Sequence, residues 1–81
     1  MQRDAIYARL TEILRDVFDD DDIVARPELT AADVDGWDSF AHLNVVFSVE
    51  RAFRISFAAS ETTALKNVGD LVELIERKTA A

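Results

Sequence analysis

The first pattern of apolar and polar positions is that of an amphipathic helix. Apolar side chains recur every three or four residues over positions 4–18, while Arg9, Glu12 and Asp16 occupy the opposite face. This spacing puts the apolar residues on one side of a helix, which other parts of the chain must cover. The apolar face consists of Ile6, Leu10, Ile13, Leu14 and Val17.

A second helix is predicted over residues 39–53, and it is apolar around most of its circumference. We therefore expect this helix to lie centrally and to contact several neighbours. Its apolar positions are Phe40, Leu43, Val45, Val46, Phe47, Val49 and Phe53. The remaining narrow stripe consists of Ala41, Asn44, Ser48 and Arg51.

Two more helices are predicted in the last third of the chain. After an extended connection through Ile55 and Phe57, a short helix is expected over residues 60–65. Asn67 is then the expected N-cap of a final helix, with Asp70 in the position of the acidic partner of a capping box. The apolar stripe of that helix consists of Val68, Leu71, Val72 and Ile75.

Residues 19–38 are predicted to form a long loop between the first two main helices. The four consecutive aspartates at 19–22 place negative charge at a helix C-terminus, where it opposes the macrodipole and ends the helix. A loop of this length in a compact domain is usually functional. Its expected anchors to the core are Ile23, Val24, Leu29 and Val34.

These elements predict an all-α fold that forms a single domain over residues 1–81. The expected architecture is a small four-helix bundle, with three main helices, one short helix and the long loop between the first and second helices. The chain contains no cysteine, which excludes disulfides and thiolate metal sites. Stability must therefore come from helix packing.

The charge of the chain is concentrated in the long loop. Residues 19–38 contain eight acidic side chains and one basic side chain, Arg26, so they account for the whole net charge of −7. Such charge disfavours nucleic acid and anionic membranes as partners, and a partner chosen by charge should be basic. Residues 1–4 lack the apolar core of a signal peptide, and no stretch approaches 18 apolar residues, so we expect a cytoplasmic protein.

Ser39 stands at the start of the second helix and has three conceivable roles: helix cap, catalytic nucleophile or modification site. Asp38 is an equally good N-cap, which would leave the Ser39 hydroxyl free on the first turn. Catalysis is disfavoured because the only histidine, His42, lies on the same helix and no Gly-x-Ser-x-Gly elbow is present. We therefore predict no catalytic residue, and an anionic group on Ser39 would be favoured by the positive helix end.

The segment Asp38-Ser39-Phe40, preceded by Gly36 and Trp37, resembles the attachment motif of acyl and peptidyl carrier proteins. In that family, the serine of Asp-Ser-Leu carries 4'-phosphopantetheine. The match extends through the later helices at Leu43, Val46, Phe47, Val49, Glu50, Phe53, Phe57, Leu65, Val68 and Leu71. The resemblance implies a bundle of acyl-carrier type and a passive carrier rather than an enzyme.

By this resemblance, a phosphopantetheinyl transferase would use coenzyme A and magnesium to esterify Ser39, and Asp38 would help to engage the transferase. The arm would carry an acyl group as a thioester and present it to an acyl ligase or synthase and to downstream enzymes of a lipid or specialised-metabolite pathway. The carrier is expected to be a monomer. The expected partner contacts are Trp37, Phe40, Ala41, Asn44, Ser48, Arg51 and Leu65.

The polar stripe of the second helix departs from the family pattern. Housekeeping fatty-acid carriers place acidic residues there, whereas this chain has Ala41, Asn44, Ser48 and Arg51. Docking through this helix should therefore be more apolar and less sensitive to salt. This suggests a specialised carrier loaded by its own ligase or synthase.

The aromatic residues are expected to belong mainly to the core. Trp37 and Phe40 should pack the loop onto the bundle, with shielding of the arm or partner contact as the alternative for Trp37. Phe47, Phe53 and Phe57 should fill the interior. Bulky rings there would leave little room for a long acyl chain and would favour short or polar cargo.

No metal site is predicted. His42 should be packed or hydrogen-bonded, because no second histidine or thiolate is present to complete a metal site. Asp33, Asp35 and Gly36 have the local look of an EF-hand, but Ala31 and His42 would stand at its first and twelfth positions, where acidic ligands are needed.

Three alternatives to an acyl carrier remain open. An aminoacyl or peptidyl carrier of non-ribosomal peptide-type synthesis shares the serine motif, and the sequence does not specify the cargo. A helical adaptor with the carrier fold would never be modified. A small esterase is the third, and activity on simple esters would test it.

Overall fold

The chain folds into helices alone. The structure is a computed structural model that describes residues 2–80, and within that range it contains four α-helices, one 3-10 turn and no strand. The elements are α1 (Arg3–Phe18), the 3-10 turn (Ala31–Asp33), α2 (Ser39–Phe53), α3 (Ala59–Thr63) and α4 (Val68–Thr79). The predicted all-α class, with three main helices and one short helix, is confirmed. In residues 2–80 no helix is both long enough and apolar enough to cross a bilayer.

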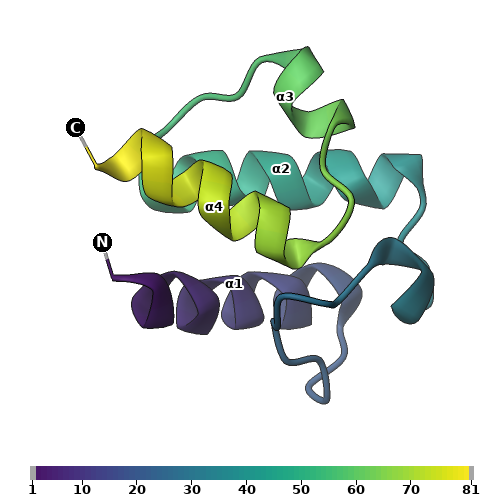
Figure 1. Cartoon of the computed structure of the whole chain (residues 1–81). Helices are drawn as coiled ribbons and strands as arrows, with labels where there is room; N and C mark the ends of the chain where they lie inside the picture. The colour runs from purple at the N-terminus through teal and green to yellow at the C-terminus, as the bar shows by residue number, and fades with distance from the viewer. Residues whose placement is uncertain (1, 81) are drawn as a thin grey trace.

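Two of the three long helices run opposite to the first, so their starts lie at the same end of the bundle. In Figure 1, α1 runs one way, and α2 and α4 run back the other way. α1 packs against both α2 and α4. The first turns of α2 and α4 therefore lie at the same end as the long loop, and the start of α1 and the end of α4 lie at the opposite end.

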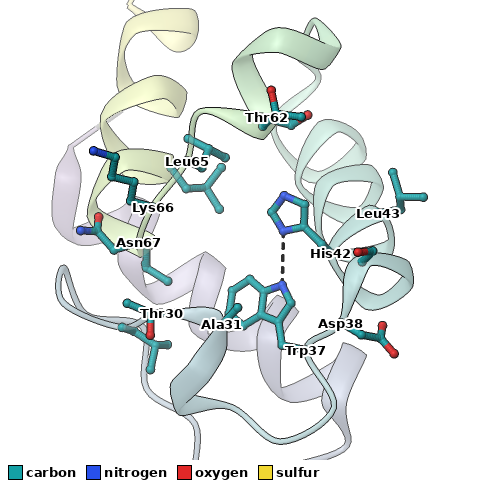
Figure 2. Close-up of a pocket in the computed structure, with 15 residues that line it drawn as sticks. Thr30, Ala31, Trp37, Asp38, His42, Leu43, Thr62, Leu65, Lys66 and Asn67 are labelled. Carbon is teal, nitrogen blue, oxygen red and sulfur yellow. Dashed lines mark hydrogen bonds between the residues drawn. The ribbon is translucent and has the colours of Figure 1, made fainter.

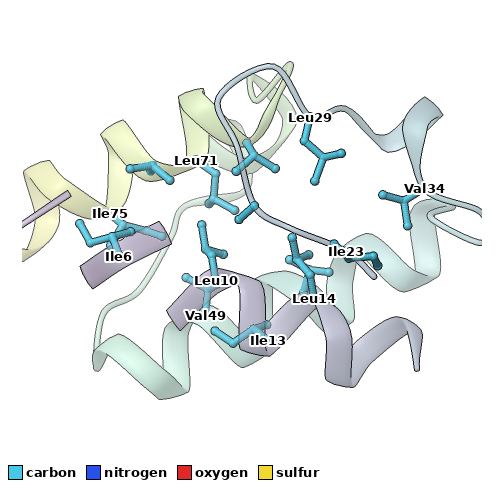
Figure 3. Close-up of a cluster of buried hydrophobic side chains, with 14 residues drawn as sticks. Ile6, Leu10, Ile13, Leu14, Ile23, Leu29, Val34, Val49, Leu71 and Ile75 are labelled. Carbon is cyan, nitrogen blue, oxygen red and sulfur yellow. The ribbon is translucent and has the colours of Figure 1, made fainter. Parts of the chain in front are cut away.

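The core is built from aliphatic side chains of the three long helices. Figure 3 shows Ile6 of α1 beside Ile75 of α4, and Leu10 of α1 beside Val49 of α2. Within the described residues, no polar or charged residue is buried. The core therefore depends on apolar burial, at about 25 cal/mol per Å² of apolar surface. The largest fully buried side chains are Ile6, Leu10, Leu14, Ile75, Val45, Val49, Val68 and Val72.

The long loop is anchored to the core by four apolar side chains. Ile23, Leu29 and Val34 are buried, as the sequence predicted. The prediction for Val24 is wrong, because its side chain is 51% exposed and Ala25 is buried in its place. The chain is not helical here, and alternate side chains of an extended backbone point to opposite sides.

Hydrogen bonds from α1 hold the start of the loop. The Thr11 hydroxyl accepts a bond of 2.9 Å from the Ala25 N–H and donates one of 2.9 Å to the Tyr7 carbonyl. The Arg15 Nε donates to the Ile23 carbonyl at 2.7 Å. These side chains satisfy backbone groups that a loop packed against a helix would otherwise leave unpaired.

The start of α4 holds the middle of the loop. The Val68 N–H donates to the Leu29 carbonyl at 2.8 Å, and the Gly69 N–H donates to the Pro27 carbonyl at 3.0 Å. A Cβ at Gly69 would lie only 3.0 Å from that Pro27 oxygen. Glycine at this position therefore lets the loop backbone approach α4 closely enough to form both bonds.

The outer face of α2 is not covered, contrary to prediction. Phe40 is 74% exposed, Leu43 52% and Phe47 56%, so the predictions that Phe40 packs onto the core and that Phe47 fills it are wrong. The buried side of α2 carries Val45 and Val49. Phe40, Leu43 and Phe47 stay uncovered, because α3 has only five residues and cannot cover a helix of 15.

At the end of α2 and in the connection that follows it, the aromatic side chains lie against the core, closer to the prediction than Phe40 and Phe47 do. Phe53 and Phe57 are half-buried and pack against the core cluster. The N–H of Phe57 donates to the Glu50 carboxylate at 2.8 Å, which ties the connection back to α2. The short helix occupies Ala59–Thr63 rather than residues 60–65.

Two ion pairs join segments that are distant in sequence. Arg3 of α1 donates two hydrogen bonds to Glu76 of α4, at 2.7 and 3.3 Å. The hydrogen bond from Arg3 is the main cause that holds the pKa of Glu76 below its ordinary value of 4.5. Lys78 pairs with Glu61 at 3.1 Å and joins α4 to α3. The pKa of Glu61 is lowered first by the Ala58 N–H and then by Lys78.

Substitution of Glu76 by glutamine should change how stability depends on pH. The lowered pKa means that the charged carboxylate stabilises the fold above pH 4.5 and that this contribution is lost as the pH falls through the lowered pKa. Glu76→Gln should therefore be less stable than the wild type at neutral pH, and the difference should vanish in acid. Urea unfolding of both proteins, at neutral pH and in acid, measures this difference in stability.

Asp16→Asn is the matched control, because Asp16 is an exposed carboxylate of α1 with no ion pair to any other residue in 2–80. It should keep the acid dependence of the wild type. A difference between Glu76→Gln and the wild type that persisted well below pH 4.5 would contradict the assignment of the effect to the Arg3 pair.

Candidate functional site

A tight turn delivers the chain to the start of α2. Gly36 has a φ of 86°, a left-handed conformation that favours glycine. The Trp37 N–H donates to the Val34 carbonyl at 3.3 Å, and the Asp38 N–H donates to the Gly36 carbonyl at 3.0 Å. The turn thus fixes Trp37 and Asp38 before the helix begins.

Asp38 caps α2, as the sequence predicted. Its Oδ1 accepts a hydrogen bond of 2.8 Å from the Ala41 N–H, and its carbonyl accepts one of 2.9 Å from the His42 N–H. Ser39 is the first residue of the helix and is exposed. Among residues 2–80, no group forms a hydrogen bond with the Ser39 hydroxyl. The hydroxyl is therefore free for chemistry rather than used for capping.

The backbone around Ser39 suits an attached anion. The N–H groups of Ser39 and Phe40 belong to the first turn of α2 and have no acceptor among the described residues. Such amides, together with the positive end of the helix dipole, favour a phosphate group. A phosphodiester on the Ser39 Oγ is compatible with this position, since the side chain is exposed and no neighbour competes for it.

Trp37 and His42 form a hydrogen-bonded pair beside Ser39. The Trp37 Nε1–H donates to the His42 Nδ1 at 3.2 Å, and the two rings are stacked with centroids 6.2 Å apart. The indole also contacts Phe18 at 5.3 Å between ring centroids. Two predictions are thereby confirmed: Trp37 packs the loop onto the core, and His42 is hydrogen-bonded.

A cavity of about 680 Å³ opens next to Ser39. It lies between the first turns of α2 and α4, with the end of α3 and the long loop as further walls. Figure 2 shows the Trp37 and His42 rings pointing into it from one side and Leu65 facing them from the other. Its lining includes Leu29, Trp37, Ser39, His42, Leu65 and Leu71.

The seven residues expected to contact partners do not form one continuous surface. Trp37 and Leu65 are half-buried and line the cavity, whereas Phe40 is exposed on the outside of α2. Ser48 and Arg51 border a second, polar groove together with side chains of α1. Asn44 is exposed and Ala41 is half-buried on α2.

Sequence reasoning missed two exposed residues of α2, Leu43 and Phe47. Together with Phe40 they recur at a spacing of three and four residues, and we name this set the α2 apolar stripe. The spacing identifies a shared face of a helix. It carries no information on whether another element covers that face, which is why the prediction that Phe40 and Phe47 pack into the core is wrong.

The serine and the histidine do not form a nucleophile–base pair. The His42 Nδ1 is occupied by Trp37, and no hydrogen bond joins His42 to Ser39. In the described part of the chain, no three His, Asp or Glu side chains lie close enough together to hold a metal ion.

Comparison with known proteins identifies the family. No protein-family model matches the chain, and no curated protein gives a significant match. Among solved structures, the chain is similar to the solution NMR structure of holo acyl carrier protein from Geobacter metallireducens. The sequences are 49% identical, the alignment covers 91% of this chain and 85% of that chain, and the TM-score is 0.86.

The chain belongs to the acyl carrier protein family. The resemblance inferred from the serine motif and the helix order is therefore confirmed, as is the acyl-carrier type of the fold. Acyl carrier proteins are carriers rather than enzymes.

The division of roles between Asp38 and Ser39 in this acyl carrier protein can be tested by a pair of alanine variants. Asp38→Ala removes the cap and should cost about 1 kcal/mol of unfolding free energy. Ser39→Ala removes a hydroxyl that bonds to no described residue and should leave the unfolding free energy unchanged. Urea unfolding measures both, and a loss in Ser39→Ala equal to that in Asp38→Ala would contradict the assignment.

Proposed function

We propose that the protein carries an acyl group as a thioester on a 4'-phosphopantetheine arm attached to Ser39. The observation that supports this most directly is the exposed Ser39 hydroxyl, which forms no hydrogen bond to the described residues and stands at the mouth of the cavity. The related protein from Geobacter metallireducens was solved in its holo form. The prosthetic group supplies the thiol that this chain lacks, since its sequence has no cysteine.

Asp38 has a second role in this proposal. Its Oδ1 caps the helix, while no hydrogen bond to residues 2–80 engages its Oδ2. The second oxygen remains available for a basic side chain or the magnesium ion of a phosphopantetheinyl transferase. The transferase would esterify the Ser39 hydroxyl with the phosphopantetheinyl group of coenzyme A.

The remaining partners follow from the carrier role. They are an acyl ligase or synthase that loads the arm and downstream enzymes that process the acyl group, in a lipid or specialised-metabolite pathway. The carrier acts as one domain and as a monomer in the cytoplasm, and it catalyses no reaction itself. An aminoacyl or peptidyl carrier would use the same Ser39 attachment, and an adaptor would use the same fold without it.

Intact mass tests the attachment. After incubation with coenzyme A, magnesium and a broad-specificity phosphopantetheinyl transferase, the wild type should gain one phosphopantetheinyl group. Ser39→Ala should gain none, while His42→Ala, which keeps the serine, should still gain it. Folded, unmodified wild type that gained no mass would contradict the carrier proposal and favour the adaptor.

Partner enzymes would dock on the α2 apolar stripe of Phe40, Leu43 and Phe47. All three side chains are more than half exposed and lie on the helix that begins with Ser39. The carboxylate of α2, Glu50, is half-buried and bonded to the Phe57 N–H. The exposed face of α2 therefore offers a partner mainly apolar surface, which favours a partner with an apolar counterpart.

If partners dock on the α2 apolar stripe, the KM of the transferase for the carrier should depend only weakly on salt. Phe47→Ser should raise the KM of the transferase for the carrier several-fold, because the contact loses buried apolar surface. Val24→Ser is the matched control, since Val24 is a comparably exposed aliphatic residue outside α2, and it should leave the KM unchanged. A KM for the wild type that rose steeply with salt would indicate docking through charges instead.

A further inference from the structure

The cavity is confined to one end of the bundle. On α2 its lining extends from Ser39 to Leu43, and at 1.5 Å per residue this is about 6 Å along the helix axis. Beyond it, Val46 and Val49 are buried in close packing, with exposures of 6% and 0%. The cavity therefore lies at the same end of the bundle as Ser39, within reach of a group tethered there.

One wall of the cavity carries a hydrogen-bond donor with a fixed orientation. The His42 Nδ1 accepts from the Trp37 indole, so in the neutral imidazole the proton resides on Nε2. Figure 2 shows the imidazole in the cavity with only one of its nitrogens joined to Trp37. No acceptor among residues 2–80 takes up the Nε2–H, which is thus available to a ligand.

The other polar groups of the lining are mostly donors or are already engaged. Figure 2 shows the Lys66 ammonium group pointing away from the cavity, and the Asn67 carbonyl oxygen is used to cap α4. The Thr62 hydroxyl donates its proton to the Ala59 carbonyl. The one carboxylate in the lining, Asp38, caps α2. An oxygen acceptor on the cargo would therefore be stabilised by the free donor on His42.

We propose that Trp37 and His42 select an acyl group that bears an oxygen acceptor, a hydroxyl or a keto group, and hold it in the cavity beside Ser39. The His42 Nε2–H donates to that oxygen. Trp37 is a positioning residue, because its indole N–H fixes the imidazole orientation. This inference rests on the proposed attachment of the arm to Ser39.

The experiment compares cargo that differs by one hydroxyl. The transferase loads the carrier from the coenzyme A thioesters of butyrate and β-hydroxybutyrate, and intact mass confirms each product. Trp37 is the only tryptophan, so a proton–nitrogen correlation spectrum contains a single indole N–H signal. This signal reports directly on the bond to His42.

The indole signal should shift from its holo position more in the β-hydroxybutyryl form than in the butyryl form. His42→Phe should keep a ring in place but abolish the difference between the hydroxylated and plain cargo. Lys66→Gln is the matched control, since it alters another polar side chain of the cavity and should retain the difference. Far-UV circular dichroism checks that each variant is folded.

The outcomes separate this inference from the proposed function. No mass gain from coenzyme A itself would overturn the attachment and the inference with it. A mass gain with equal indole shifts for butyryl and β-hydroxybutyryl cargo would overturn the inference alone. A difference that survived in folded His42→Phe but disappeared in Lys66→Gln would also overturn the role of His42.

Discussion

The contact between the long loop and the first residues of α4 determines how the rest of the molecule is arranged. Two backbone hydrogen bonds, from Val68 to Leu29 and from Gly69 to Pro27, hold the middle of the loop against the helix. The loop must then return to α2 across the same end of the bundle. The cavity beside Ser39 exists because these segments meet there without filling the space between them.

The start of α2 shows how one residue frees its neighbour. A helix N-terminus needs a side chain to satisfy its unpaired amides, and both Asp38 and Ser39 have suitable oxygens. Because Asp38 takes that role, the hydroxyl of Ser39 makes no structural contribution that a modification would destroy. The same arrangement leaves the serine exposed on the first turn, where another enzyme can reach it.

Local patterns predicted the helices, the Asp38 cap and the serine motif, because each depends on residues close together in sequence. These patterns did not predict the burial of a side chain or a contact that depends on residues distant in sequence. The apolar spacing of Phe40 and Phe47 is the same for a covered and an uncovered helix face, and only the shortness of α3 decides between them. The bond between Trp37 and His42 likewise requires the geometry of the turn at Gly36, which composition and periodicity do not specify.

The pairing of Arg3 with Glu76 places the beginning of α1 beside the end of α4, at the opposite end of the bundle from Ser39 (Figure 1). The length of α2, 15 residues, or about 22 Å at 1.5 Å per residue, separates the two ends. A tether, affinity tag or fused enzyme joined at either end of the chain would thus leave the serine facing outward. Such a fusion would raise the effective concentration of a neighbouring enzyme without obstructing its access to the arm.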